Sequence, residues 1–249
     1  LWLKWKLFPG VNLHTRDRFR RIPRWLAPPR EGRNSVILDA GCGNGMLSWQ
    51  AWRRGYRVLG VTIKDSEVNG CRALFNQYLG LPEEEIAFRK HNLYDTQPLL
   101  DEFGPFDHII CTEVLEHIRD DKGICAAFWR LLKPGGQVHI TTPNAEHPYN
   151  AAFPLDLEER GGHVRPGYTE ASYRALLEPI GFCIERLAGL GGPVRQAFSS
   201  RIKVMQHKLG PAAGFPLFVL SLPFLPLDPS EPKVPYSLYV QATKPLDAE

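Results

Sequence analysis

An acidic residue two positions before the first of three closely spaced glycines gives the first chemical signal in the sequence. Residues 36–45 read Val-Ile-Leu-Asp-Ala-Gly-Cys-Gly-Asn-Gly, so Asp39 lies near the end of an apolar run and the glycines lead into a segment with helical spacing. Glycine lets the backbone approach a ligand closely, and the start of the next helix offers free N–H groups. A carboxylate at Asp39 repels a diphosphate and attracts a cationic or amine-bearing ligand. A dinucleotide fingerprint would also need its third glycine at Met46, so the segment predicts a nucleotide-type site that is not for NAD.

Two carboxylates and an imidazole form a second group of candidate residues. Glu113, Glu116 and His117 stand at positions i, i+3 and i+4, which puts them on one face of a helix. Carboxylate oxygens and imidazole nitrogens can together bind a divalent cation. The competing interpretation is that the Glu-His pair only locks the loop beneath a ligand, and the sequence leaves both open.

His163 is the candidate general base. It lies in the segment 162–169, Gly-His-Val-Arg-Pro-Gly-Tyr-Thr, which precedes a predicted helix. An imidazole can accept a hydroxyl proton near neutral pH, and the alternative is a histidine that only fixes the loop. Glu113 is the second catalytic candidate. Further polar side chains available to an acceptor favour an enzyme, and they are Tyr149, Arg165 and Tyr168.

Alternating apolar runs and segments of helical spacing predict the elements that must position these residues. Strands are expected to begin near residues 36 and 106 and to cover 56–63, 86–88, 137–142, 182–187 and 236–242. Helices are expected at 15–27, 46–52, 65–79 and 169–180, with glycine or proline as stop signals after most of them. Strands that alternate with helices indicate an α/β domain.

Two segments resemble motifs of a known enzyme family. Residues 36–45 resemble motif I of the class I S-adenosylmethionine-dependent methyltransferases, whose usual form is V-L-D-x-G-C-G-x-G. Residues 106–118, Phe-Asp-His-Ile-Ile-Cys-Thr-Glu-Val-Leu-Glu-His-Ile, resemble the central motif of the ubiquinone-biosynthesis O-methyltransferase type, and the turn Leu-Lys-Pro-Gly-Gly at 132–136 is characteristic of the superfamily. The resemblance covers about 36–187. It implies a Rossmann-like seven-stranded sheet, six strands parallel and the last antiparallel, with S-adenosyl-L-methionine as the cofactor.

The resemblance also implies which residues contact the cofactor and the acceptor. Some quinone and small-RNA methyltransferases of this kind use a Glu-x-x-Glu-His sequence for a metal, and the stretch around His163 resembles the one that overhangs the methyl group. The implied cofactor-binding residues are Asp39, Gly41, Cys42, Gly43, Thr62, Ile63, Asn92, Leu93, Thr112 and His117.

Two of these positions depart from the usual pattern. Most family members place Asp or Glu at the position of Thr62, where a charged hydrogen bond to the ribose contributes roughly 1.5–3 kcal/mol against roughly 0.5–1.5 for a neutral one. The Gly-Val-Thr-Ile sequence is similar to the cyclopropane-fatty-acid synthase branch, in which a later polar residue, here Glu67, helps to hold the ribose. Asn92 and the N–H of Leu93 would contact the adenine, although an asparagine after a strand is otherwise most often a turn residue.

Two parts of the chain are expected to cap the domain formed by residues 34–249. The arm 1–33 mixes tryptophans with arginines, which fits a helix over the cofactor cleft, a membrane-surface segment or a nucleic-acid contact. The insertion 189–235 joins the last two strands, and a connection of this length is normally functional. Its segment 215–227 is apolar and broken by prolines, so we expect a substrate lid and no membrane-spanning helix.

Composition excludes few classes. The 249 residues are 43% hydrophobic with a net charge of +3, which allows one full core and argues neither for nor against nucleic acid. Five scattered cysteines indicate a reduced, cytoplasmic protein, with membrane contact still open. No signal peptide is evident, and because the chain begins at Leu1 an upstream piece can be missing.

The predicted function is methyl transfer from S-adenosyl-L-methionine to a small or lipid-linked acceptor, at a hydroxyl group. Two alternatives remain, which are C-methylation of an apolar acceptor and a non-catalytic cofactor-binding module. A nicotinamide enzyme is disfavoured because it would carry Gly or Ala in place of Met46 and an acid in place of Thr62. Nucleic acid is not expected as a partner, and the oligomeric state is open.

Overall fold

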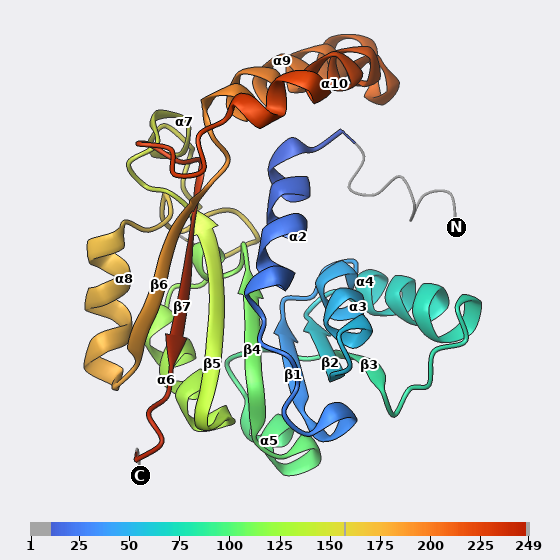
Figure 1. Ribbon diagram of the computed structural model, residues 1–249, viewed down its shortest axis with the longest axis vertical. Coiled ribbons are helices and arrows are strands. Elements are labelled where there is room, and N and C mark those ends of the chain that lie inside the picture. The colour runs from blue at the N-terminus through green and yellow to red at the C-terminus, as the bar shows by residue number, and fades with distance from the viewer. Residues whose placement is uncertain (1–10, 157, 248–249) are drawn as a thin grey trace.

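The computed structural model describes residues 11–156 and 158–247, which form one α/β domain (Figure 1). Seven strands make a single sheet in the order β3-β2-β1-β4-β5-β7-β6. The strands are β1 (Val36–Ala40), β2 (Arg57–Thr62), β3 (Ile86–Lys90), β4 (Phe106–Thr112), β5 (Leu132–Pro143), β6 (Cys183–Leu190) and β7 (Ser237–Thr243).

Strand pairing confirms the Rossmann-like seven-stranded sheet and changes one detail of it. Neighbouring strands from β3 through β5 pair in parallel. Strand β7 lies between β5 and β6 and pairs antiparallel with both. The sheet is therefore mixed. The expected six parallel strands do not all pair with one another, because β7 separates β6 from β5. Because the chain reverses through the insertion, β6 joins the sheet only through its antiparallel partner β7.

Helices cover both faces of the sheet. Buried side chains of α2, α3 and α4 pack on one face, and those of α5, α6 and α8 pack on the other. The helices are α2 (Leu13–Trp25), α3 (Met46–Arg53), α4 (Asp65–Cys71), α5 (Gln97–Phe103), α6 (Asp121–Leu131), α7 (Pro148–Ala151), α8 (Glu170–Leu177), α9 (Pro193–Leu209) and α10 (Phe215–Ser221).

Two expected helices are shorter than the sequence predicted. The segment 65–79 is α helix only to Cys71 and continues as a π-helical turn, Arg72–Tyr78. The segment 169–180 is α8 followed by a short 3-10 turn, and it ends at Gly181 with φ 112°. The N-terminal helix α2 begins two residues earlier than expected, since Asn12 caps it by accepting a hydrogen bond from the N–H of Thr15.

Helix α2 and the insertion meet toward the carboxyl ends of β1, β4 and β5, where α9 and α10 lie above α2 and form a cap (Figure 1). Leu13 of α2 packs with Ile202 of α9 and Phe218 of α10. A buried ionic network fixes this cap, since the Arg195 guanidinium lies 2.6 Å from Asp228 and 3.7 Å from Asp17. Among the described residues, no helix is long and apolar enough to cross a membrane.

Candidate functional site

A cavity of about 300 Å³ opens at the carboxyl ends of β1 and β4. Open α/β sheets bind their ligands at this edge, where the strand order reverses. A smaller cavity of about 200 Å³, lined in part by Tyr56, Asp107 and His108, lies at the other end of the sheet and is not the ligand site by that criterion. The larger cavity is lined by Thr15, Arg18, Phe19, Asp39, Gly41, Cys42, Gly43, Asn44, Leu47, Thr112 and Glu113.

Asp39 is a buried carboxyl group in the wall of this cavity. Its residue is 1% exposed, and its carboxylate accepts a hydrogen bond of 2.6 Å from the Ser48 hydroxyl, in the first turn of α3. Burial raises the pKa of Asp39 to about 6 against the weaker opposing effect of that hydrogen bond. A cationic ligand in the cavity would stabilise the charged carboxylate, as the sequence predicted.

The glycines give the backbone a path that other residues could not follow. Gly41 has φ 80°, and a Cβ atom there would lie 2.3 Å from Cγ2 of Val114. Gly45 caps α3 in the left-handed region, with φ 74°, and a Cβ atom there would lie 2.7 Å from the Phe75 ring. The turn therefore follows a path that side chains at Gly41 and Gly45 would block, and it is fixed by its own backbone, since the N–H groups of Gly41 and Cys42 donate to the Val61 carbonyl.

Thr62 is held by an acidic side chain at the end of β2. Its hydroxyl donates a 2.6 Å hydrogen bond to the Glu67 carboxylate, which also lies 3.3 Å from the Lys64 ammonium. The structure therefore brings the Glu67 carboxylate to the strand end at which the family resemblance leads us to expect an acidic residue. Ile63 follows and is 64% exposed, which leaves its side chain free to cover a ligand.

Asn92 is occupied by a local turn. Its side-chain carbonyl accepts a hydrogen bond of 3.1 Å from the N–H of Tyr94, as in an Asx turn. Leu93 is buried at 7% exposure. Adenine recognition by these two residues stays a prediction, and the turn interpretation of Asn92 gains support.

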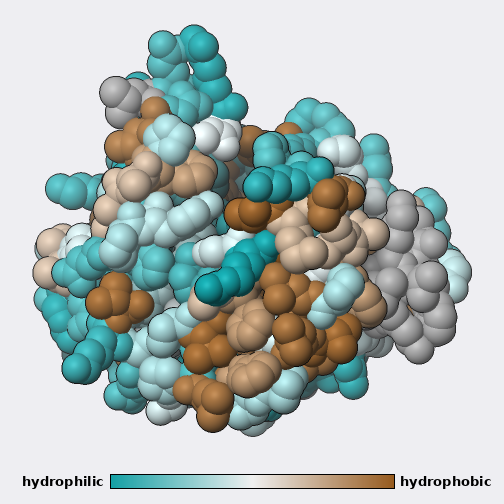
Figure 2. Space-filling model, turned by 90° about the horizontal axis from the view of Figure 1, so that it is seen from above, coloured by the Kyte–Doolittle hydropathy of each residue, from teal (hydrophilic) through white to brown (hydrophobic). Residues whose placement is uncertain are grey.

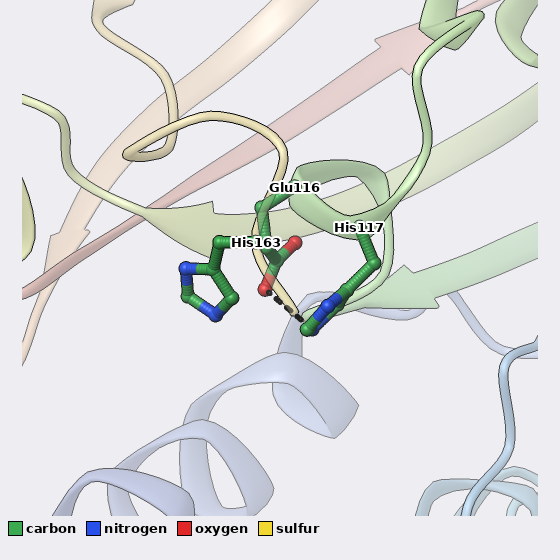
Figure 3. Close-up of side chains that lie close together, drawn as sticks. All are labelled: Glu116, His117 and His163. Atoms are coloured by element: carbon green, nitrogen blue, oxygen red, sulfur yellow. Dashed lines mark ion pairs between the residues drawn. The ribbon is translucent and has the colours of Figure 1, made fainter. Parts of the chain in front are cut away.

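Three side chains from two loops converge next to the cavity, and Figure 3 shows them pointing toward one another. Glu116, His117 and His163 each offer one ligand atom, and these atoms lie within 4.8 Å of one another. Nδ1 of His117 contacts the Gly162 carbonyl at 2.9 Å, so this nitrogen donates its N–H to the carbonyl and Nε2 is the nitrogen that faces Glu116. Nε2 lies 3.9 Å from Glu116.

This group contains two buried polar atoms without hydrogen bonds. Oε2 of Glu116 and Nδ1 of His163 have no partner among the described residues. Burial, and then the charge of Glu113, raises the pKa of Glu116 well above its usual value. Burial, and then His117, lowers the pKa of His163. A bound cation would give both atoms a partner, since it can be coordinated by a neutral imidazole and by a carboxylate oxygen.

Main-chain contacts bring His163 to its partners, which lie more than forty residues earlier in the chain. The N–H of Val164 donates to the Glu116 carbonyl at 2.8 Å, and the Arg165 guanidinium donates to the carbonyls of Ile118 and Arg119. Arg165 and Tyr168 also bind Asp121. These two side chains therefore hold the loop, and they are not free to bind an acceptor as the sequence suggested.

The expected helix carrying Glu113, Glu116 and His117 is wrong. Only Leu115–His117 forms a short 3-10 turn, and Glu113 precedes it with φ 55°. The strained backbone points its carboxylate at the Arg18 guanidinium, 3.0 Å away. Glu113 thus lines the cavity, and the third member of the group with Glu116 and His117 is His163. The catalytic role of Glu113 stays a prediction.

Arg18 is the charged residue of the cavity lining that sequence reasoning did not single out as a site residue. The basic and aromatic composition of the arm was visible, but which arginine faces inward depends on how α2 lies on the sheet. Thr15, Arg18 and Phe19 share one side of α2 and line the cavity. None of the residues that line the cavity comes from the insertion. The predicted role of the insertion as a substrate lid therefore gains no support from this cavity and stays a prediction.

Comparison with known proteins agrees with this geometry. A family model described as a methyltransferase domain matches residues 14–187. The ubiquinone biosynthesis O-methyltransferase of Acinetobacter baylyi is 34% identical over 109 residues, which is 43% of each chain. That of Bordetella avium is 30% identical over 174 residues, 63% of this chain and 66% of its own. The chain spans about half the length of the curated relatives it matches.

Solved structures share the fold at low sequence identity. Magnesium protoporphyrin IX methyltransferase from Synechocystis, with bound S-adenosylhomocysteine, gives a TM-score of 0.60 at 16% identity over 95% of this chain and 85% of that chain. The family match extends from α2 to β6 and includes the Asp39 cavity and the His163 loop. The chain therefore belongs to the methyltransferase domain family and is a class I S-adenosylmethionine-dependent methyltransferase.

Proposed function

We propose that this methyltransferase transfers the methyl group of S-adenosyl-L-methionine to a hydroxyl group of a small apolar or lipid-linked acceptor. The observation that carries the proposal is the group of Glu116, His117 and His163 beside the cofactor cavity. A sulfonium methyl is already electrophilic, so an uncharged amine with a free lone pair needs little help, whereas a hydroxyl must lose its proton during attack. The imidazole and carboxyl groups of this cluster can accept that proton.

The cofactor would lie in the Asp39 cavity with its sulfonium end toward Thr112 and Glu113. Asp39 would face the ammonium group of the methionine part, and Thr62 with Glu67 would hold the ribose. Arg18 closes this space from α2 through its ion pair with Glu113. Holding donor and acceptor in line and excluding water is the main contribution the protein can make to methyl transfer.

The three side chains can serve the acceptor in either of two ways. A divalent cation held by Glu116, His117 and His163 would lower the pKa of a bound hydroxyl. The chain fits such an ion, because it would satisfy the unpartnered oxygen of Glu116 and nitrogen of His163. Without an ion, the neutral imidazole of His163 accepts the proton directly.

The apolar or lipid-linked nature of the acceptor is supported by two observations. The relatives that match the chain are named for ubiquinone biosynthesis. Aromatic side chains border His163, since the ring of Phe153 lies 4.7 Å from it and Phe153 is 39% exposed. An apolar ring of the acceptor could pack there with its hydroxyl toward His163.

Transfer of label from methyl-tritiated S-adenosyl-L-methionine into lipid and aqueous extracts of the source organism tests the proposal. We expect label in the organic phase. His163→Gln should lower kcat by about 100-fold or more, which is typical for loss of general acid–base catalysis, without changing affinity for S-adenosylhomocysteine. The exposed His207 gives the matched control, and His207→Gln should leave kcat unchanged.

A chelator separates the two roles of the group. Loss of label that added Mg²⁺ restores would assign Glu116, His117 and His163 as ligands of a cation. Insensitivity to the chelator would assign His163 as the base. Label in the aqueous phase alone would refute the apolar acceptor. Intact cofactor binding with no transfer, or an acceptor methylated at carbon, would refute O-methylation.

A further inference from the structure

The insertion presents an apolar surface to the outside of the molecule. Helix α10 buries only Phe218 and Ser221, and the 3-10 turn that follows it, Leu222–Leu227, buries no side chain. Figure 2 shows apolar side chains gathered on the face of the molecule seen from above. The exposed apolar residues of the insertion's second half, called here the α10 surface, are Phe215 (55%), Val219 (46%), Leu220 (57%), Leu222 (46%), Phe224 (43%) and Leu227 (70%).

The segment that carries α9 and α10 has charged side chains of one sign only. No aspartate or glutamate occurs between residues 187 and 227. Helix α9 contributes exposed basic side chains at Arg201, Lys203 and Lys208, and none of these three forms an ion pair within the described part of the chain. Lys203 lies over the ring of Tyr149, 5.1 Å from its centroid. Apolar side chains beside unpaired cations match an anionic bilayer surface, where each Lys or Arg adds attraction to the lipid headgroups.

The α10 surface is held rigidly against the catalytic domain. Arg195, at the start of α9, bridges Asp228, which follows the apolar segment, and Asp17 of α2. Val194 and Arg195 also donate their N–H groups to the Asp228 carboxylate. Helix α2 also lines the cofactor cavity. Anything that binds the α10 surface is therefore held in a fixed position relative to that cavity.

We propose that the α10 surface docks the enzyme on an anionic lipid bilayer. Phe215, Leu220, Leu222, Phe224 and Leu227 would enter the boundary between headgroups and acyl chains. Helix α9 would contact lipid phosphates through Arg201 and Lys208, which are seven residues apart and so share one face of the helix. The carboxyl edge of the sheet, with its cavity, then lies on the membrane side of the molecule. This inference concerns a partner surface and holds whichever acceptor atom is methylated.

Co-sedimentation of the full chain with vesicles tests the docking. Phosphatidylcholine vesicles with and without phosphatidylglycerol are the probes. Replacing three exposed side chains, in the variant Leu220→Ser/Phe224→Ser/Leu227→Ser, should weaken vesicle binding by about 30-fold or more, because each loses part of the gain from leaving water. The control is Tyr78→Ser/Leu246→Ser, which removes apolar side chains that are 55% and 77% exposed on other elements and should bind like the unmodified chain.

A charge variant separates the apolar and electrostatic contributions. Arg201→Gln/Lys208→Gln should lower binding to anionic vesicles by about tenfold and leave binding to phosphatidylcholine alone unchanged. All variants should keep the melting temperature and the affinity for S-adenosylhomocysteine, which shows that the domain is folded.

Three outcomes would overturn the proposal. These are absence of vesicle binding by the unmodified chain, equal binding by the triple serine variant, and a stable dimer in light scattering that the triple variant converts to monomer. The last would assign the α10 surface to a second copy of the chain. None of these outcomes depends on methyl transfer, so failure of the docking and failure of the proposed reaction are separable.

Discussion

Replacing Asp39 by asparagine should make the empty protein more stable while weakening its binding of the cofactor. The raised pKa of Asp39, about 6 against 3.8, means that the folded state holds the charged carboxylate poorly. At about 1.4 kcal/mol for each tenfold change in acidity, the charged form destabilises the empty fold by about 3 kcal/mol. Asparagine keeps an acceptor for the Ser48 hydroxyl and carries no charge. At pH 7.5, Asp39→Asn should therefore raise the melting temperature by about 6–12 °C.

The pH dependence follows from the sign of this shift. A pKa that is higher in the folded state makes the carboxyl stabilising when protonated, so the loss of stability begins above pH 3.8 and is complete above about 6. The gain from Asp39→Asn should fall to about half at pH 5. Burial lowers the pKa of His108 to about 4, with the opposite effect on stability in the same range. The difference between the two proteins at each pH is therefore the quantity to compare.

Ligand binding should change in the opposite direction. Asparagine cannot offer a charged hydrogen bond to the ammonium of the methionine part, and that loss corresponds to roughly 10- to 150-fold in Kd. Thermal melts with and without S-adenosylhomocysteine, together with calorimetric titration, measure both effects. The control Asp65→Asn removes a carboxylate that is 69% exposed and should alter neither. A lower melting temperature of the empty Asp39→Asn protein, or unchanged cofactor affinity, would refute the reasoning.

Three further predictions follow from the site and the cap. Gly41→Ala places a Cβ atom 2.3 Å from Val114 at φ 80° and should abolish cofactor binding in calorimetry. The control Gly104→Ala also has a positive φ, 70°, but has open space around its Cβ and lies outside the cavity lining, so it should cost only about 1–2 kcal/mol of folding stability; equal behaviour of the two would contradict the close approach. Glu67→Gln should raise the Kd for S-adenosylhomocysteine by about tenfold through the loss of charge beside Thr62, with the exposed Glu84→Gln as an unaffected control. Arg195→Met leaves the buried Asp228 carboxylate without its cation and leaves Asp17 paired with Arg21 alone, so it should lower the free energy of unfolding in urea by about 3 kcal/mol; a change as small as that of the exposed Arg201→Met would show that the cap is not fixed by this network.

Local sequence was sufficient for the cofactor half of the molecule. Asp39, the glycines and Ser48 lie within one strand, turn and helix, so their relative placement follows from neighbouring residues. Thr62 and Glu67 are similar, because five residues separate them and a single hydrogen bond joins them. The apolar strands and their helices were predictable for the same reason, apart from the pairing of β6 through β7, which depends on how a long connection returns to the sheet.

Tertiary structure decided the acceptor side and the cap. The helical spacing of Glu113, Glu116 and His117 was misleading. The turn after β4 directs Glu113 toward Arg18, and His163 from a distant loop lies beside Glu116 and His117 instead. Which arginine of the arm faces the cavity, and whether the apolar residues of the insertion are buried or exposed, likewise depend on packing between elements that are distant in the sequence, such as α2 with α9 and β6. The periodicity of a local segment predicts which side chains share one face of one helix or strand. The acceptor-side group and the exposed surface of the cap depend on contacts between different elements, which form only in the folded chain.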